Sequence, residues 1–486
     1  MFVNFLSDGG IFILCLINIA LNETIGYSVY GTILVAIQVL IVMFFLIRND
    51  YFRSFVLFLV FLFTALEFPA DLKLRPKIYT FRTIEILNVS ISTWVLIIFF
   101  VYGLIFRNGI SKLLNNISKF QIILYVLLIC SILIGLSGNI FSDYAFQYFL
   151  KDVQYYLIIL FSFIIFSDFG GRDIDKAIER IILYTLCNRS IVSFVGISFG
   201  ALKGNYGGVP IFSYDAIDFF VVFTILAISR TNTFLKNLLI VISWILGIIS
   251  NVIIQSSGKS LLLIGVVFLE IIVLVMKTRS SFLRSPLVKV FLILAIFIGL
   301  LIMYDLINTV SSKNILLSSK LYQVQTLLDL NWVRNPYNLE PSPRDRVLEI
   351  YNTYYYFVEN PQFFLLGTGM GGYFKEAKYY NYSASDVGGY STYEIKSRQF
   401  YSPHESLANV FLKFGIVGIV LYLWMLVSLL RKQRCGQDLF LKNILFFNIL
   451  LFIGFSMKMA VVIGYAVYKM DSSRHYSTSS KVSRIF

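Results

Sequence analysis

The side chain best suited to proton transfer in this sequence is His404, in the segment Tyr401-Ser402-Pro403-His404-Glu405-Ser406. The chain has two histidines, and the other, His475, lies in a polar segment near the C-terminus. Both protonation states of an imidazole are accessible near neutral pH, as a general acid or base requires. The alternative is a histidine that anchors the start of a helix, with Ser402 or Glu405 as a cap. The residues alone leave both interpretations open.

Basic residues supply a second kind of chemistry, the binding of anions. Arg344 and Arg346 open a helical-looking stretch, and Lys259 lies in a predicted hairpin turn at 256–260. Guanidinium and ammonium groups bind phosphates through charge-assisted hydrogen bonds. The alternative for each is a solvated loop charge or a long side chain anchored at an interface. Arg189 differs because it falls inside the apolar run 178–199, where a charge is costly and a site is the default hypothesis.

Carboxylates near the same arginines offer little for a metal. Asp345 and Glu349 are four residues apart and would share one face of a helix, so spacing alone permits a weak Mg²⁺ site. No Asp-x-Asp motif and no histidine cluster accompanies them. We therefore expect a metal-independent site without a cofactor, with Glu349 as a substrate ligand beside Arg346.

Tyrosines are concentrated in one polar stretch, residues 306–405, which holds 13 of the 31 in the chain. Their rings could stack on the apolar faces of a ligand while their hydroxyl groups form hydrogen bonds. Packing at a lipid headgroup interface explains them equally well. The tyrosines in question are Tyr354, Tyr355, Tyr356, Tyr379, Tyr380 and Tyr382, and Tyr355 is our candidate substrate ligand.

Gly367, Gly369 and Gly372 have the spacing of a dinucleotide-binding motif. That motif requires a strand before it and a helix after it in a βαβ unit, and no such pattern surrounds these glycines. We interpret them as a backbone turn.

The elements that must position these residues are membrane helices. The chain has 486 residues, of which 58% are hydrophobic and only 14% are charged. A soluble fold could not cover so much apolar surface, whereas lipid solvates it. The net charge of +14 is spread over short loops instead of an aromatic–basic surface, which argues against nucleic acid as a partner.

The fold class predicted is all-α, a polytopic transmembrane bundle of about 12–14 spans with a large extracytoplasmic loop. We expect thirteen apolar runs to span: 5–22, 27–47, 52–68, 88–106, 119–138, 153–167, 178–199, 211–229, 237–254, 260–276, 289–305, 406–429 and 443–468.

Lysine and arginine set the orientation. One set of alternate short loops holds eighteen of them and the other set holds seven. The richer set is cytoplasmic by the positive-inside rule, which places the N-terminus inside. Thirteen spans would then put the basic C-terminal segment outside, against the rule. Either the last run is a re-entrant hairpin interrupted by Lys458, or the count is wrong by one.

The predicted organisation has four parts. A transmembrane bundle covers residues 1–305, and the large loop covers 306–405 on the extracytoplasmic side. C-terminal transmembrane helices cover 406–468, and a basic polar tail covers 469–486. A connection as long as 306–405 is usually functional or disordered, and its aromatic content favours function.

Three places in the sequence resemble the O-antigen ligase/polymerase superfamily, which includes the Wzy-type polysaccharide polymerases. The first is an arginine-led helix at Arg346 followed by Pro361 and the glycine-rich stretch 366–372. The second is Pro403-His404-Glu405-Ser406 with the downstream stretch 413–418. The third is the serine–basic turn 256–260. Glu405 stands where the family commonly has Asn, and Lys259 stands where Arg is usual.

The resemblance implies an enzyme of the bacterial inner membrane that joins undecaprenyl-pyrophosphate-linked oligosaccharide repeat units into a surface polysaccharide. His404 would act as general base, and Arg346, Arg344 and Lys259 would stabilise the pyrophosphate leaving group. Its partners would be the lipid-linked donor and acceptor, membrane lipid, a chain-length regulator and a flippase. Two alternatives are an O-antigen ligase and, in a different class, a flippase or transporter for lipid-linked oligosaccharides. A transporter should show inverted repeats and midplane charges.

Overall fold

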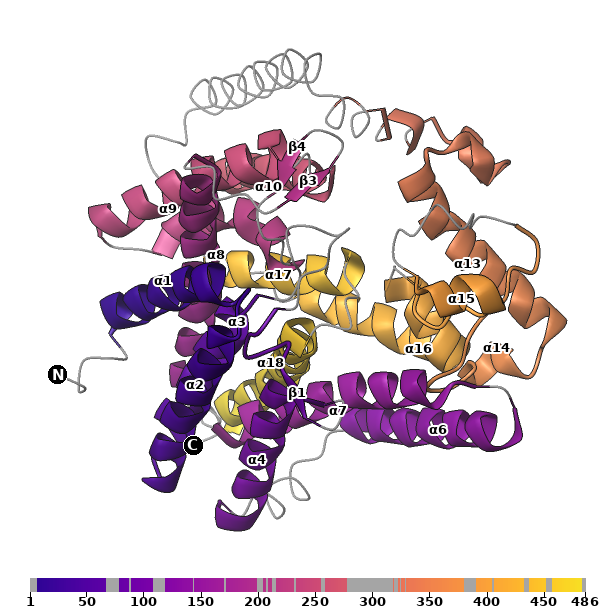
Figure 1. Cartoon of the computed structure of the whole chain (residues 1–486), viewed down its shortest axis with the longest axis horizontal. Helices are drawn as coiled ribbons and strands as arrows, with labels where there is room; N and C mark the ends of the chain where they lie inside the picture. The colour runs from indigo at the N-terminus through magenta and orange to yellow at the C-terminus, as the bar shows by residue number, and fades with distance from the viewer. Residues whose placement is uncertain are drawn as a thin grey trace. The chain divides into compact units, whose positions relative to one another are not determined.

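The architecture comes from a computed structural model, and it is helical almost throughout the part of the chain that the model describes (Figure 1). The described residues are 7–66, 78–86, 89–107, 119–142, 144–169, 172–198, 204–206, 209–211, 216–230, 233–254, 258–277, 318, 322–323, 325–327, 329–379, 390–403, 406–431, 437–451 and 457–482. The strands within these ranges form two short antiparallel pairs, β1 (Glu85–Ile86) with β2 (Val89–Ser90) and β3 (Gly204–Tyr206) with β4 (Val209–Ile211).

Within the described residues, six helical segments are long and apolar enough to cross a membrane. They are Asp8–Ile25, Tyr30–Ile47, Ile122–Phe141, Phe146–Phe169, Phe234–Asn251 and Leu407–Ser428. Four shorter apolar helices accompany them, at Tyr51–Thr64, Ile91–Phe106, Leu263–Val273 and Leu439–Asn448. The prediction of an all-α polytopic bundle is confirmed. The run 289–305 lies outside the described residues, and the count of thirteen spans stays a prediction.

The last apolar run is two helices. The expected span 443–468 is divided between α17 (Gln437–Leu451) and α18 (Met457–Val482). Residues 469–482, expected to be a polar tail, continue α18 as helix. Lys458, the residue that interrupts the apolar run, lies in the first turn of α18 and is buried.

The chain divides into two compact units, which we call the N-terminal unit and the loop unit. The N-terminal unit comprises Met1–Ser92, Asp175–Leu328 and Gln433–Ile444, and the loop unit comprises Thr93–Ile174, Asp329–Lys432 and Leu445–Phe486.

The N-terminal unit is built around α3 (Tyr51–Thr64). Its sequence is apolar on all sides, and all its residues from Ser54 to Thr64 are buried, as expected for a central helix. The helices α1 (Asp8–Ile25) and α2 (Tyr30–Ile47) pack against it. The rest of this unit contains α8 (Arg172–Ser198), the 3₁₀ helix η2 (Ala216–Arg230), α9 (Phe234–Ile248) with its π-helical extension η3 (Ile249–Ile254), and α10 (Gly258–Lys277).

Ion pairs join α1, α8 and α9 in the N-terminal unit. Asp8, in the first turn of α1, forms an ion pair with Arg180 at 2.7 Å and another with Lys236. Arg180 and Lys236 both belong to the loop set predicted to be cytoplasmic, and that orientation stays a prediction. Asp8 brings these two residues together near the start of α1.

The loop unit packs a folded polar segment onto apolar helices. Its helices α6 (Lys119–Phe141) and α7 (Phe146–Phe169) lie side by side, and α7 packs along α18. The polar segment contributes the 3₁₀ turns η5 (Asn331–Val333) and η6 (Pro336–Asn338), then α13 (Pro341–Glu359), α14 (Phe363–Leu366) and α15 (Thr392–Ser397), drawn in orange in Figure 1. The long helix α16 (Ser406–Arg431) follows, and α4 (Ile91–Phe106) begins at the edge of this unit.

Gly415 bends α16 where α14 meets it. Its φ is +61°, a value that breaks the helix inside α16 and that favours glycine. A Cβ at this position would lie 2.5 Å from the carbonyl group of Leu365 and 2.7 Å from the backbone nitrogen of Gly367. The absence of a side chain therefore lets the end of α14 contact the backbone of α16 directly.

We predict that Gly415→Ala destabilises the protein. The left-handed conformation alone costs a residue with a Cβ about 1–3 kcal/mol, and the contact with Leu365 adds to that. Gly265 on α10 is the matched control, since a Cβ there meets nothing within 4 Å. In a helix interior, Ala is favoured over Gly by about 1 kcal/mol, so Gly265→Ala should not lower stability.

Thermal melting of the two purified variants in detergent measures the difference. Equal melting temperatures for Gly415→Ala and the unsubstituted protein would contradict the assigned backbone.

Candidate functional site

The candidate site is the folded polar segment of the loop unit, residues 329–379 and 390–403, together with the helix ends beneath it. Pro341 occupies the first turn of α13, where its missing N–H costs nothing. The two described parts of the segment are joined by an antiparallel bridge in which Phe374 and Phe400 exchange backbone hydrogen bonds of 3.1 and 3.0 Å. Buried aromatic residues form a core beneath it, namely Phe357, Phe374, Tyr390 and Phe400, with Ile395 and Leu412.

A buried ion pair fastens the glycine turn, residues 367–372, to the helices. The Nζ of Lys413 on α16 lies 2.6 Å from a carboxylate oxygen of Asp152 on α7, and both side chains are at most 2% exposed. The same carboxylate oxygen accepts a hydrogen bond from the backbone N–H of Gly371 at 2.8 Å. Lys413 also donates to the carbonyl oxygen of Gly372 at 2.7 Å. Two helices and the turn thus share one pair of charges.

Backbone contacts complete the docking of the turn. Thr368 donates to the carbonyl oxygen of Leu412 through its backbone nitrogen at 2.7 Å and its hydroxyl group at 2.9 Å. Met370 donates to the carbonyl oxygen of Ser131 on α6 at 3.0 Å. Gly367, Gly369 and Gly371 all have positive φ. The interpretation of this stretch as a backbone turn is confirmed.

Glu394 organises the other end of the segment. Its side chain completes a capping box at the start of α15 with Ser391. Its second carboxylate oxygen accepts a hydrogen bond from the backbone N–H of Tyr401 at 3.0 Å. Tyr401 is fully buried and stacks on Tyr148 of α7 with a ring separation of 4.0 Å and an interplanar angle of 5°. The residues that lead into His404 are therefore fixed by α7 and α15.

His404 and Glu405 lie outside the described residues, so the proton-transfer role of His404 stays a prediction. The chain on either side is described. Pro403 is buried. The helix α16 begins at Ser406, and its residues Ala408 and Asn409 are buried. The segment that carries His404 is thus held at both ends in the loop unit.

Arg344 and Arg346 both lie in the opening turns of α13 and are half-buried. Because they are two residues apart, their side chains leave the helix about 200° apart around its axis. The Nε of Arg344 is enclosed and has no hydrogen-bond partner among the described residues. An enclosed donor nitrogen without an acceptor is costly, so the guanidinium group of Arg344 is suited to an anionic ligand.

Glu349 faces the interior of the segment. It is fully buried, and its carboxylate accepts a hydrogen bond of 2.7 Å from the hydroxyl group of Tyr390. This contact ties α13 to the residue just before α15. Direct substrate binding by Glu349 stays a prediction, and the observed role is to hold the aromatic core in place.

Tyr355 belongs to a cluster of rings that includes Tyr354 and Tyr379. The Nζ of Lys378 donates to the hydroxyl group of Tyr355 at 2.6 Å and lies 4.2 Å from the centre of its ring. This hydrogen bond raises the pKa of Lys378 above its usual value. Tyr356, by contrast, packs against the aromatic core. Tyr380 and Tyr382 lie outside the described residues.

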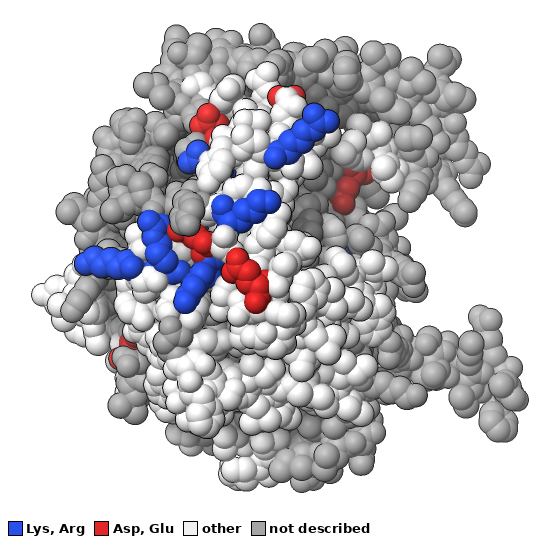
Figure 2. Space-filling model, turned by 90° about the vertical axis from the view of Figure 1, so that its right-hand side faces the viewer, with Lys and Arg blue, Asp and Glu red and all other residues white. Residues whose placement is uncertain are grey.

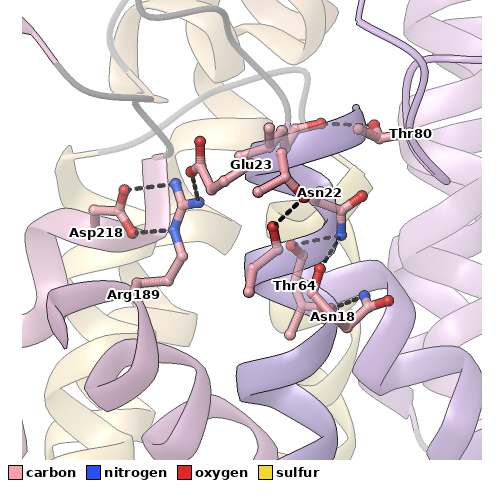
Figure 3. A network of polar contacts seen from close by, with 10 residues as sticks. Asn18, Asn22, Glu23, Thr64, Thr80, Arg189 and Asp218 are labelled. Carbon is pink, nitrogen blue, oxygen red and sulfur yellow. Dashed lines mark hydrogen bonds and ion pairs between the residues drawn. The ribbon is translucent and has the colours of Figure 1, made fainter. Parts of the chain in front are cut away.

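Arg189 lies in the N-terminal unit, within a network of buried polar side chains (Figure 3). Its Nε and one terminal nitrogen bind the carboxylate of Asp218 on η2 at 3.1 and 2.9 Å, and the other terminal nitrogen binds Glu23 on α1 at 2.9 Å. Asn18, Asn22, Gln38 and Thr64 continue the network across α1, α2 and α3. Arg189 therefore connects three elements, and any contact with substrate stays a prediction.

Lys259 also belongs to the N-terminal unit. The helix α10 begins at Gly258, so Lys259 lies in its first turn and the expected hairpin turn ends there. The side chain of Lys259 is outside the described part of the structure. The structure thus groups Arg344, Arg346, Glu349 and Tyr355 on α13, whereas Arg189 and Lys259 lie in the other compact unit.

The polar segment has a basic surface although its charges balance in number. It holds seven basic residues, Arg334, Arg344, Arg346, Lys375, Lys378, Lys396 and Arg398, and seven acidic residues, Asp329, Glu340, Asp345, Glu349, Glu359, Glu376 and Glu394. Glu349 and Glu394 are buried, and the side chain of Glu376, paired with Arg398, is 2% exposed. Figure 2 shows basic and acidic side chains gathered on one part of this face, next to a described surface without charged side chains.

Sequence reasoning missed the two residues that hold the turn, Lys413 and Asp152, as well as Glu394. The signal for Lys413 was present, because it is an ionisable residue inside the apolar run 406–429. The same argument singled out Arg189. Among the described residues, no group of three or more His, Cys, Asp and Glu side chains lies close enough to hold a metal ion.

Comparisons with family models, with curated proteins and with solved structures find no match to this chain.

Lys413→Met should destabilise the loop unit strongly. Removing one partner of a buried ion pair leaves the carboxylate of Asp152 uncompensated, which costs about 3–5 kcal/mol. The double variant Lys413→Met/Asp152→Asn should be less damaging than the single variant, because the amide oxygen still accepts from Gly371 and no lone charge remains. Thermal melting of both variants in detergent tests this order, and a double variant less stable than Lys413→Met would refute it.

Arg189→Lys should lower the stability of the protein, and Arg189→Met should lower it further. Lysine keeps the charge but cannot reproduce the paired hydrogen bonds to Asp218, and methionine leaves two buried carboxylates without their partner. Arg53→Lys is the control, since Arg53 pairs with Asp50 at a half-exposed site, where such a pair contributes about 0–1 kcal/mol. Unchanged melting of Arg189→Met with loss of activity alone would identify Arg189 as a substrate ligand instead.

Proposed function

We propose that this chain is a polymerase that joins undecaprenyl-pyrophosphate-linked oligosaccharide repeat units at the outer face of the bacterial inner membrane. In this reaction the bond between the anomeric carbon of the growing glycan and its pyrophosphate breaks. A hydroxyl oxygen of the acceptor glycan forms the new bond to that carbon. The hydroxyl proton passes to a base, and undecaprenyl pyrophosphate leaves.

The observation that carries the proposal is the enclosed Nε of Arg344, which has no acceptor among the described residues. It lies at the start of α13, in a folded polar segment whose outer surface is basic. A pyrophosphate leaving group gains negative charge as the glycosidic bond breaks. A positioned guanidinium stabilises that charge most in the transition state, which is the condition for catalysis.

Arg346 would assist from the opposite side of α13. Since the two arginines diverge around the helix, they would contact different phosphate oxygens or different substrates. Lys259, which the family resemblance also implies for the leaving group, lies in the N-terminal unit and carries no part of this argument. The proposal assigns no step to a metal ion or a cofactor.

His404 would act as the base or orient the acceptor hydroxyl group. Its segment begins at Pro403, next to Tyr401, which Glu394 and Tyr148 hold in place. A base must be positioned within hydrogen-bond reach of the proton that it removes. Fixed flanking residues support this role for a histidine at the entry to α16.

A transporter or flippase is the competing class, and the buried charges of Arg189, Glu23 and Asp218 are the observation that favours it. Intramembrane charges often mark a transport pathway. In this chain, however, the guanidinium of Arg189 already binds two carboxylates from other helices. A structural connection explains these charges without a transported substrate.

A deletion strain complemented with variants tests the function. A polymerase predicts that the deletion leaves single repeat units on the surface acceptor, and that His404→Ala fails to restore longer chains although the protein is inserted in the membrane at normal levels. Accumulation of free lipid-linked polymer in the deletion strain would identify a ligase instead. Loss of all repeat units from the outer face, with lipid-linked units retained inside, would indicate a flippase. Polymer of normal length from His404→Ala would remove this histidine from the mechanism.

A further inference from the structure

Three tyrosines from distant parts of the sequence form one platform in the loop unit, which we call the tyrosine platform: Tyr148 on α7, Tyr393 on α15 and Tyr401 at the entry to α16. Tyr401 is buried and forms the base, with Tyr148 stacked on it at 4.0 Å. Tyr393 lies at a ring separation of 6.4 Å from each of the other two, at interplanar angles of 29° and 31°. Tyr393 is 45% exposed, so its ring is accessible to a ligand.

Hydrogen bonds fix the platform without covering it. The hydroxyl groups of Tyr148 and Ser391 are 2.8 Å apart, and the hydroxyl group of Tyr401 donates to the side-chain oxygen of Gln399 at 2.9 Å. Glu394 binds the backbone N–H groups of Ser391 and Tyr401 with its two carboxylate oxygens. One buried carboxylate therefore sets the positions of both α15 and the base of the platform. Such preorganisation lowers the ordering cost of binding a ligand.

Exposed polar side chains flank the platform, beside the exposed apolar side chains of Phe146 and Leu150 on α7. Gln147 and Lys151 are exposed on α7, on either side of Tyr148 in the sequence, and Ser391 is exposed beside it. Rings that present an apolar face beside amide, hydroxyl and ammonium groups match a ligand with both C–H faces and hydroxyl groups.

We infer that the tyrosine platform binds a saccharide, with one sugar ring lying against Tyr393 and its hydroxyl groups near Ser391, Gln147 and Lys151. This inference rests on the proposed function, within which the platform is the subsite for the acceptor glycan. The location supports that assignment, because Tyr401 is three residues from His404, the proposed base. A glycan held on the platform would place a terminal hydroxyl group at the entry to α16.

Saccharide binding can be measured separately from catalysis. The probe is a set of oligosaccharides prepared by partial acid hydrolysis of the surface polysaccharide of the strain that carries this chain, titrated against the full-length protein in nanodiscs. Tyr393→Ala should weaken this binding by about tenfold, whereas Tyr393→Phe should retain most of it because the ring remains. Tyr30→Ala is the matched control, since Tyr30 is 69% exposed at the start of α2 in the N-terminal unit.

A second probe separates the sugar from its lipid carrier. Undecaprenyl pyrophosphate without a glycan should bind the unsubstituted protein and Tyr393→Ala equally. Equal oligosaccharide binding by Tyr393→Ala and the unsubstituted protein would overturn the platform as a saccharide site, as would a lack of oligosaccharide binding by a protein that extends chains in cells. Oligosaccharide binding that depends on Tyr393, in a protein whose deletion leaves chain length unchanged, would keep the platform and reject the polymerase function.

Discussion

The folded segment of the loop unit depends on the ion pair between Lys413 and Asp152. Each charge lies in the interior, where the free-energy cost of lost hydration is offset only when the other charge and further hydrogen bonds are present. The further hydrogen bonds come from the backbone of Gly371 and Gly372. The stability of the ion pair therefore depends on the position of the turn. A displaced turn would leave Asp152 and Lys413 with fewer partners, so the pair acts as a restraint on the whole segment.

Glycine makes this restraint geometrically feasible. Gly369 approaches α6 so closely that a Cβ would lie 2.6 Å from the backbone nitrogen of Gly135, and Gly371 stands equally near Phe149 of α7. Gly415 allows the corresponding approach from α16. The segment therefore contacts three helices backbone to backbone. Side chains such as Tyr373 and Tyr401 are left to fill the space above the turn, and both are almost fully buried.

Much of the fold could be predicted from hydropathy, because an apolar run can be recognised as a membrane helix from its own residues, without knowing which other helices it contacts. The division of residues 443–468 into α17 and α18 could not, since one lysine within a long apolar run is compatible with either arrangement. The candidate site was predicted only in part. Arg344 lies at the start of α13 and its role as an anion ligand stays a prediction, whereas Glu349, an expected substrate ligand, is buried against Tyr390. Pairings such as Asp152 with Lys413 join residues far apart in the chain, and a single sequence carries no signal of which charges meet.

The buried carboxylates have different roles in the two units. The carboxylates around Arg189 join helices of the N-terminal unit to one another. In the loop unit, Glu349, Glu376 and Glu394 turn inward to hold tyrosines, Arg398 and backbone, while most of the basic residues of the same segment stay at its surface. These carboxylates are thus withdrawn from the surface. The surface of the segment is therefore basic, although the segment has equal numbers of basic and acidic residues. For a segment proposed to receive a pyrophosphate-linked glycan, Glu394, the carboxylate that positions the tyrosine platform, is also withdrawn from the surface, where its charge would repel the substrate.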